Sequence, residues 1–160
     1  GTGPGTGFVT GPDRRRWLRT SDLGRLEAGV LSVLGRLDDV IVTGGVKVAP
    51  AAVERVISAL PSVAEVVVCG VPDEEWGRRV VAAVVPLDPA APPTPAQVRE
   101  AVADKLGRAS APRQLLVLHR IPVRGPGKPD RAAVAALAER AAMDQAGDDA
   151  RGTRQTGDRD

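Results

Sequence analysis

Aromatic side chains are nearly missing from this chain of 160 residues, which has one Phe, two Trp and no Tyr. Proteins that bind single-stranded nucleic acid stack bases on aromatic side chains, so the composition argues against that class. Apolar residues still make up 42%, more than a disordered chain carries. We therefore expect one folded domain of ordinary size, with a core of Val, Leu, Ile and Ala.

Cysteine and histidine are just as scarce, with one residue of each. A single cysteine excludes an internal disulfide and is typical of a reducing compartment. Cys69 ends the apolar run 66–69, which indicates core packing rather than nucleophilic chemistry. His119 follows an apolar segment and has no evident partner for acid–base chemistry, and no metal-ligating cluster is evident.

Long apolar runs and blocks of one charge are missing as well. No run approaches the roughly 18 residues of a membrane helix and no signal peptide is evident, so we expect a cytoplasmic protein without membrane insertion. The formal charge is +2, and acidic and basic residues are interleaved despite a pI of 9.2. The densest basic run, Arg14 to Arg16, is interpreted as a solvated loop, so nucleic acid is not an expected partner.

The amino-terminal segment superficially suggests a phosphate-binding loop. Residues 1–7 (GTGPGTG) contain four glycines, but they lack a Gly-Lys-Ser/Thr ending and the flanking strand and helix. Residues 1–13 are therefore interpreted as a flexible lead. Short apolar pieces around residues 27–29 then predict a β-hairpin over 17–34.

Val-rich segments and amphipathic segments alternate from residue 38 onward. Continuous apolar runs predict strands over 63–71 and 78–85 that are buried on both faces, with shorter strands at 40–42 and 114–119. Helices are expected after three start signals: Pro50, the capping box at 94–97, and Asp130. This order predicts a small α+β domain in which helices cover a mixed sheet. Beyond Met143 a disordered tail is expected.

Three motifs stand at the borders of this domain. They are Thr20-Ser21-Asp22-Leu23, residues 35–45 (GRLDDVIVTGG), and Pro122 followed at a distance by Gly127-Lys128. Their order and spacing resemble the late motifs of the acyl-adenylate-forming ligases, and the similarity covers about residues 17–140. The resemblance implies that 1–37 end a large amino-terminal domain, that 38–143 form the carboxy-terminal lid domain, and that 144–160 are a tail.

The resemblance assigns nucleotide contacts to two residues near the start of the lid. Asp22 corresponds to a carboxylate that accepts hydrogen bonds from both ribose hydroxyls, although Ser21 stands where the family usually has glycine. Two carboxylate oxygens suit two vicinal hydroxyls. Arg36 corresponds to an arginine that contacts ribose and phosphate oxygens, a role suited to a guanidinium fork.

Conformational and catalytic roles are implied for the later motifs. Asp38 corresponds to the hinge about which the lid rotates, and Gly44 and Gly45 to a loop beside the pantetheine path of CoA. Lys128 corresponds to the lysine that reaches the α-phosphate and the substrate carboxylate, where negative charge gathers during adenylation. Only three of the 22 basic residues are lysines, which sets Lys128 apart from a random solubilising charge. Lys47 and Glu54 continue the similarity and are interpreted as structural or surface residues.

The implied activity is that of an acid–CoA ligase: a carboxylic acid and ATP give acyl-AMP, and CoA then displaces AMP. Mg²⁺ is expected to enter with ATP. Several segments, including 42–48, 70–80 and 125–131, look like the o-succinylbenzoate-CoA ligases of menaquinone biosynthesis. Fatty-acid or aryl-acid CoA ligases, and a non-catalytic lid that binds a nucleotide or protein, stay open as alternatives. Without the amino-terminal domain, which would hold the acid pocket, this portion is expected to be inactive.

Overall fold

The structure is a computed structural model that describes residues 7–152, without the side chains of Leu34 and of residues 145–152. Its elements, in chain order, are β1 (Gly7–Thr10), β2 (Arg16–Arg19), β3 (Asp22–Glu27), β4 (Val30–Arg36), the 3₁₀ turn η1 (Leu37–Asp39), β5 (Ile41–Thr43), β6 (Val46–Val48), α1 (Pro50–Ser58), β7 (Val63–Asp73), β8 (Gly77–Pro86), α2 (Pro95–Leu106), the 3₁₀ turn η2 (Arg108–Ser110), β9 (Gln114–Val117), β10 (Val123–Arg124), β11 (Lys128–Pro129) and α3 (Arg131–Gly152).

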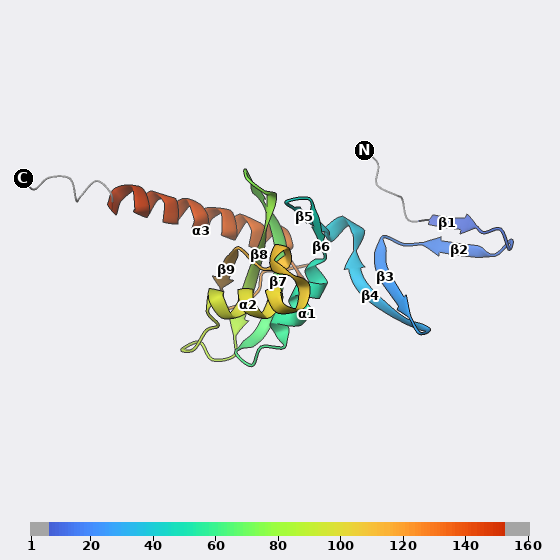
Figure 1. The fold of residues 1–160 in the computed structure, drawn as a ribbon, viewed down its shortest axis with the longest axis horizontal. Helices are drawn as coiled ribbons and strands as arrows, with labels where there is room; N and C mark the ends of the chain where they lie inside the picture. Colours follow the sequence, from blue (N-terminus) through green and yellow to red (C-terminus); the bar gives the residue numbers. More distant parts are fainter. Residues whose placement is uncertain (1–6, 153–160) are drawn as a thin grey trace, which may run out of the picture.

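A three-stranded sheet of order β7-β8-β9 lies at the centre of the domain (Figure 1). β7 and β8 are antiparallel from the Val63↔Pro86 pair to the Asp73↔Gly77 pair, and β9 joins β8 in parallel. Both long strands are rich in valine, whose branched side chain suits the pleated surface. The mixed sheet that the sequence predicts is confirmed.

Helices cover both faces of this sheet. Successive side chains of a strand point to opposite faces, so β8 contributes Val80, Ala82 and Val84 to one core and Val81 and Ala83 to another. The first core also holds residues of α1 and α2, and the second holds residues of α3. Burial on both faces explains why β7 and β8 are continuous apolar runs rather than alternating ones.

The helices begin where the sequence predicts. Pro50 occupies the first turn of α1, and Thr94 caps α2 in a reciprocal capping box with Gln97. The Asp130 carboxylate accepts hydrogen bonds from the N–H groups of Ala132 and Ala133 at 3.1 Å, which caps α3. On the predicted apolar stripe of α1, Val53 and Ile57 are fully buried.

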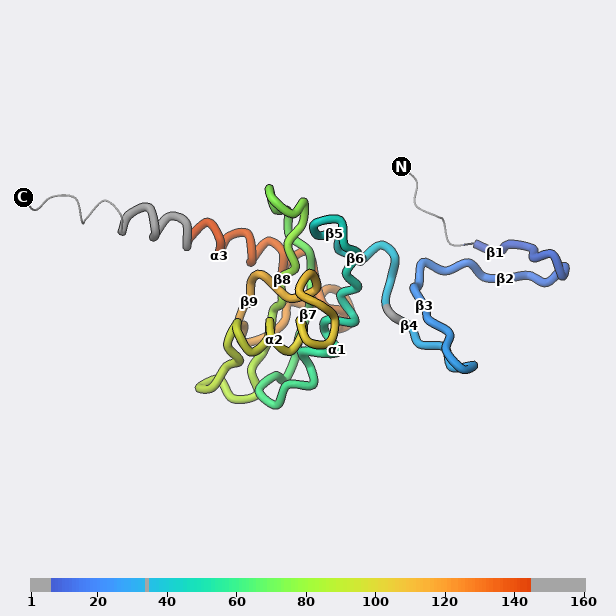
Figure 2. The backbone as a smooth tube through the Cα atoms, in the orientation of Figure 1, coloured from blue at the N-terminus to red at the C-terminus, as the bar shows by residue number. Residues whose placement is uncertain are grey.

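Two hairpins precede the domain and extend away from the three-stranded sheet (Figures 1 and 2). The predicted hairpin is β3 paired with β4, but residues 17–19 belong instead to β2, which pairs with β1. The flexible lead predicted for residues 1–13 is therefore wrong for 7–10, because backbone pairing with β2 orders a segment whose composition suggests a loop. Residues 1–6 lie outside the described part.

The last helix also differs from the prediction. α3 continues to Gly152, whereas a disordered tail was expected beyond Met143. Each further residue of a helix adds one backbone hydrogen bond, and no proline between Arg131 and Gly152 interrupts the series. Residues 153–160 lie outside the described part. Within residues 7–152, no helix combines the length and apolar character that crossing a membrane requires.

The first core gives a direct test of the packing. Ile57→Ala should lower the free energy of unfolding by about 2–5 kcal/mol, because it removes a fully buried side chain and leaves a cavity. Leu87→Ala, at a residue that is 69% exposed, is the control and should change it by no more than about 0.5 kcal/mol. Urea denaturation measures both, and equal effects would contradict this assignment of the core.

Candidate functional site

Asp22 and Arg36, the two predicted nucleotide-binding residues, are cross-strand partners. Asp22 begins β3 and Arg36 ends β4, and their Cα atoms are paired in the antiparallel register. Both are exposed. The Leu37 N–H donates to the Ser21 carbonyl oxygen at 2.7 Å, which closes the hairpin directly beside the pair. An anionic and a cationic side chain thus leave neighbouring strands at the point where the chain enters the domain.

The predicted hinge lies immediately after this pair. Asp38 belongs to the short 3₁₀ turn η1, and the Arg36 guanidinium contacts its carboxylate at 3.5 Å. Two residues later the backbone is extended at Val40 and enters β5. A short exposed turn between two paired segments is a place where the backbone can rotate without disturbing either segment.

Gly44 and Gly45 form the turn of the β5–β6 hairpin, as predicted. Their φ angles are +53° and +80°, values that glycine adopts without strain. The turn rests on Trp76, because the Gly44 N–H donates to the Trp76 carbonyl oxygen at 3.0 Å and an added Cβ would lie 2.5 Å from the ring. The Arg113 guanidinium lies 4.0 Å from the centroid of the same ring.

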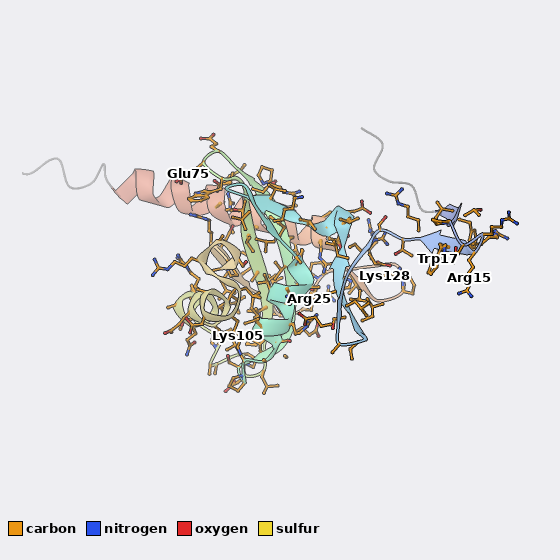
Figure 3. The ribbon with its side chains drawn as sticks, turned by 45° about the vertical axis from the view of Figure 1, so that its right-hand side comes forward. Arg15, Trp17, Arg25, Glu75, Lys105 and Lys128 are labelled. Carbon is orange, nitrogen blue, oxygen red and sulfur yellow. The ribbon has the colours of Figure 1, made fainter. Side chains whose placement is uncertain are left out.

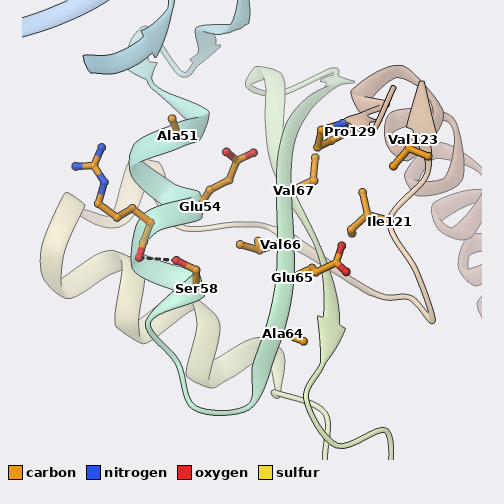
Figure 4. A pocket seen from close by; sticks show the side chains of 12 residues that line it. Ala51, Glu54, Ser58, Ala64, Glu65, Val66, Val67, Ile121, Val123 and Pro129 are labelled. Atoms are coloured by element: carbon orange, nitrogen blue, oxygen red, sulfur yellow. Dashed lines mark hydrogen bonds between the residues drawn. The ribbon is translucent and has the colours of Figure 1, made fainter. Parts of the chain in front are cut away.

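Lys128 lies on a second small hairpin, formed by β10 and β11. Gly125 and Gly127, with φ of +58° and +78°, turn the chain between the two strands, and the lysine is exposed. Figure 3 shows Lys128 well apart from Glu75, the neighbour of Trp76. Beside this hairpin, a groove of about 440 Å³ lies between α1, β7 and residues 121–129 (Figure 4).

The structure therefore brings together some of the predicted residues and keeps others apart. Asp22, Arg36 and Asp38 form one group, the two turn glycines a second, and Lys128 a third. Among the described side chains, no hydrogen bond or ion pair joins one group to another. The glycine turn and Lys128 thus lie on two different hairpins of the domain.

Glu54, interpreted from the sequence as a structural or surface residue, is part of a partly buried polar network. Its Oε1 atom accepts hydrogen bonds from the Val68 N–H and from the Arg131 guanidinium, both at 2.8 Å. The Arg131 Nε also donates to the Val68 carbonyl oxygen at 3.1 Å. Sequence reasoning missed Arg131 because its partner is 77 residues away and leaves no local pattern.

Cys69 is buried, as its apolar context predicts. Burial raises the pKa of its thiol from an ordinary 9.0 to about 11, and the positive charges of Arg131 and Arg78 oppose this effect only in part. Such a thiol is a poor nucleophile. His119 is exposed and has no hydrogen-bond partner among the described side chains. The described side chains include no group of three or more His, Cys, Asp and Glu residues arranged to hold a metal ion.

Comparison with known proteins gives the family. Residues 52–128 match the AMP-binding enzyme C-terminal domain. The chain therefore belongs to the family of AMP-binding enzyme C-terminal domains. Beyond the matched range, the first helix of the domain begins at Pro50 and α3 continues to Gly152.

Curated relatives of this domain include CoA ligases. A probable 2-succinylbenzoate–CoA ligase of Mycobacterium tuberculosis is 47% identical over 121 residues, which are 74% of this chain and 32% of the relative. A medium/long-chain-fatty-acid–CoA ligase of the same species is 42% identical over 75% of this chain and 22% of the relative. The chain thus spans a third or less of the length of these relatives.

Solved structures give the same family. The amide bond synthetase McbA of Marinactinospora thermotolerans superimposes with a TM-score of 0.70 at 39% identity, over 76% of this chain and 25% of that one. The o-succinylbenzoate CoA synthetase of Bacillus subtilis, solved with its acyl-adenylate intermediate, gives 0.66 at 34% identity, over 74% and 24%. The predicted family and fold are confirmed.

The glycine turn supports a matched pair of substitutions. Gly44→Ala and Gly45→Ala should each lower the free energy of unfolding by about 1–2 kcal/mol, because both positions have positive φ. Only Gly44→Ala places a Cβ against the Trp76 ring, so it should cost more and should shift Trp76 fluorescence in a Trp17→Phe background. Equal losses, with no spectral change, would contradict the Gly44–Trp76 contact.

The thiol supports a pH-dependent prediction. Because the folded pKa of Cys69 lies above the unfolded one, the protonated thiol should stabilise the fold fully below pH 9 and lose that effect between pH 9 and about 11. At pH 8, Ellman's reagent should modify Cys69 far more slowly in the folded protein than in urea. Rapid modification without denaturant would show that Cys69 is accessible.

Proposed function

We propose that this domain is the mobile lid of an AMP-forming acid–CoA ligase and that Lys128 is its catalytic residue. The observation that carries the proposal is the placement of Lys128, an exposed lysine held on a two-glycine hairpin at a fixed position on the domain. The match to CoA ligases over 74% of the chain supports it. We further propose that the enzyme acts in the cytoplasm, where ATP and CoA are available.

In the first step, the substrate carboxylate attacks the α-phosphorus of ATP and pyrophosphate leaves. Two anionic groups approach each other, and the Lys128 ammonium stabilises their combined charge more than it stabilises the separated reactants. Asp22 would accept hydrogen bonds from the ribose hydroxyls, and Arg36 would donate to ribose and phosphate oxygens. Their cross-strand pairing supports a shared role, because the two side chains start from adjacent positions on neighbouring strands. Mg²⁺ would accompany ATP and offset phosphate charge.

In the second step, the CoA thiol attacks the acyl carbon and AMP leaves. We propose that rotation about Asp38 withdraws Lys128 and presents the Gly44–Gly45 turn to the pantetheine chain. The separation of the two hairpins supports this sequence of events, since one rotation can exchange one for the other (Figure 3). The bare turn, with no side chain at either position, lets a ligand approach the backbone closely.

An amino-terminal domain of the same protein is the partner that the hairpins favour. β3 and β4 expose several large apolar side chains, among them Leu26 at 69% and Leu31 at 66%. Exposed apolar groups gathered on one element mark a surface that another part covers. The acid pocket and most of the ATP contacts would lie on that domain, so we expect residues 1–160 alone to show little ligase activity.

The acid is proposed to be o-succinylbenzoate, which would place the enzyme in menaquinone biosynthesis. The 47% identity to a probable 2-succinylbenzoate–CoA ligase favours this acid over the fatty acid of the relative with 42% identity. An aryl acid is the next alternative, favoured by 45% identity to a 4-chlorobenzoate–CoA ligase of Pseudomonas over 59% of the chain. The remaining alternative is a domain of the same fold that binds a nucleotide or a protein and has no catalytic activity.

Acid-dependent ATP–pyrophosphate exchange tests the proposal in the natural polypeptide that contains these residues. Exchange should occur with o-succinylbenzoate, and Lys128→Ala should lower it by a factor on the order of 10²–10³ because the stabilising charge is lost. Lys105→Ala, at an exposed position of α2, is the matched control and should leave exchange unchanged.

The other outcomes separate the alternatives. Exchange with fatty or aryl acids only would keep the ligase mechanism and discard the proposed pathway. Full exchange in Lys128→Ala would remove the lysine from catalysis. An absence of exchange with every acid would favour the non-catalytic lid.

A further inference from the structure

Arg131 contacts three separate parts of the domain through one guanidinium group. Its NH2 group donates to Glu54 on α1 at 2.8 Å, and its Nε donates to the Val68 carbonyl oxygen on β7 at 3.1 Å. Its NH1 group lies 3.9 Å from the carboxylate of Asp39 in η1. The Arg131 side chain is 34% exposed and that of Glu54 20%, so the Glu54 contact is partly shielded from water.

These contacts fix the base of the hairpin that carries Lys128. Arg131 is three residues beyond Lys128 and is the first residue of α3. Directly before it, the Asp130 N–H donates to the Pro122 carbonyl oxygen at 2.8 Å, which closes the base of the β10–β11 hairpin. Only Pro129 and Asp130 therefore separate Arg131 from Lys128 along the chain.

The same guanidinium reaches the far side of the predicted hinge. Arg36, before the hinge, contacts Asp38 at 3.5 Å, whereas Asp39, after it, contacts Arg131. Asp38 is thus joined to the segment before the hinge, and Asp39 is joined to the domain after it. The contact with Arg131 joins Asp39 to the body of the domain, which favours rotation at Asp38 over rotation in the following residues.

We propose that Arg131 is a positioning residue that couples the hinge at Asp38 to the placement of Lys128. The inference rests on the proposed function. A planar guanidinium can hold Glu54, the Val68 carbonyl and Asp39 together, which the single ammonium of a lysine cannot do. With the three Arg131 contacts intact, a rotation at Asp38 moves Lys128 as part of a rigid body. Without them, Lys128 reaches the adenylation position less precisely, and a displacement of about 1 Å there is costly.

A purely stabilising ion pair makes a different prediction. Loss of stability alone would lower the rates of adenylation and of acyl transfer by the same factor, because both half-reactions need the folded lid. Loss of coupling should affect adenylation, which uses Lys128, more than transfer of the acyl group from a preformed acyl-adenylate to CoA. The ratio of the two rates therefore separates positioning from stability.

Asp39→Asn and Arg131→Lys are the informative variants, measured in the natural polypeptide. Asp39→Asn leaves the Glu54 contact intact and weakens only the hinge side, so the urea midpoint should stay near wild type. Adenylation should fall about tenfold relative to acyl transfer. Arg131→Lys should also lower the rate of adenylation relative to that of acyl transfer, and it should lower the urea midpoint as well. Arg99→Ala, at an exposed site on α2, is the control and should change neither quantity.

Amide hydrogen exchange provides a readout that needs no activity. In Asp39→Asn, exchange should rise together in residues 37–40 and 122–130, and it should stay unchanged in α2. A rise in only one segment, or in neither, would overturn the coupling, as would equal losses in the two half-reactions. If the wild-type protein shows no acid-dependent ATP–pyrophosphate exchange, the proposed ligase function is refuted. The coupling between Asp38 and Lys128 is still tested in that case, because amide hydrogen exchange does not depend on activity.

Discussion

The pairing of β7 with β8 is the constraint on which the rest of the domain depends. Ten residues of β8 pair with β7, and their side chains alternate between two cores. One face must be covered by α1 and α2 and the other by α3, because the central residues of the two strands are apolar on both faces. The positions of the helices fix where the connecting segments lie. Two of these segments, the β5–β6 turn and the β10–β11 hairpin, carry the proposed functional residues.

The two groups are positioned by different means. The glycine turn is positioned by Trp76, which lies in the loop between β7 and β8, so its place follows directly from the central pairing. The Lys128 hairpin has no such aromatic support. It is held through Asp130 and Arg131 at the start of α3, by hydrogen bonds and ion pairs rather than by apolar packing. A surface held by polar contacts can be exposed to solvent, as a group that meets a nucleotide must be.

Much of this architecture could be predicted from the sequence. Val53 and Ile57 fall on one helical face, the capping box starts α2, and the continuous valine runs indicate strands buried on both sides. β1 could not be predicted, because Gly7 to Thr10 is a short segment among glycines and prolines whose order depends on a partner strand. The Glu54–Arg131 contact was missed for a similar reason, since its two residues lie in different helices and meet only in the folded chain.

The candidate site was located by its motifs, and the structure supplies geometry that motifs do not contain. It pairs Asp22 with Arg36, places the glycine turn and Lys128 on different hairpins, and brings Arg131, three residues after Lys128, to within 3.9 Å of Asp39 in η1. The nucleotide, hinge and catalytic roles themselves stay proposals.

The decisive measurement is a crystal structure of the natural polypeptide with a bound acyl-adenylate. In that complex, Asp22 should accept hydrogen bonds from both ribose hydroxyls. In the adenylation state Lys128 should lie within hydrogen-bond distance of the phosphate, with the Gly44–Gly45 turn far from the acyl group. An adenylate bound without Asp22, or with Lys128 and the glycine turn both at the acyl carbon, would contradict these proposed roles.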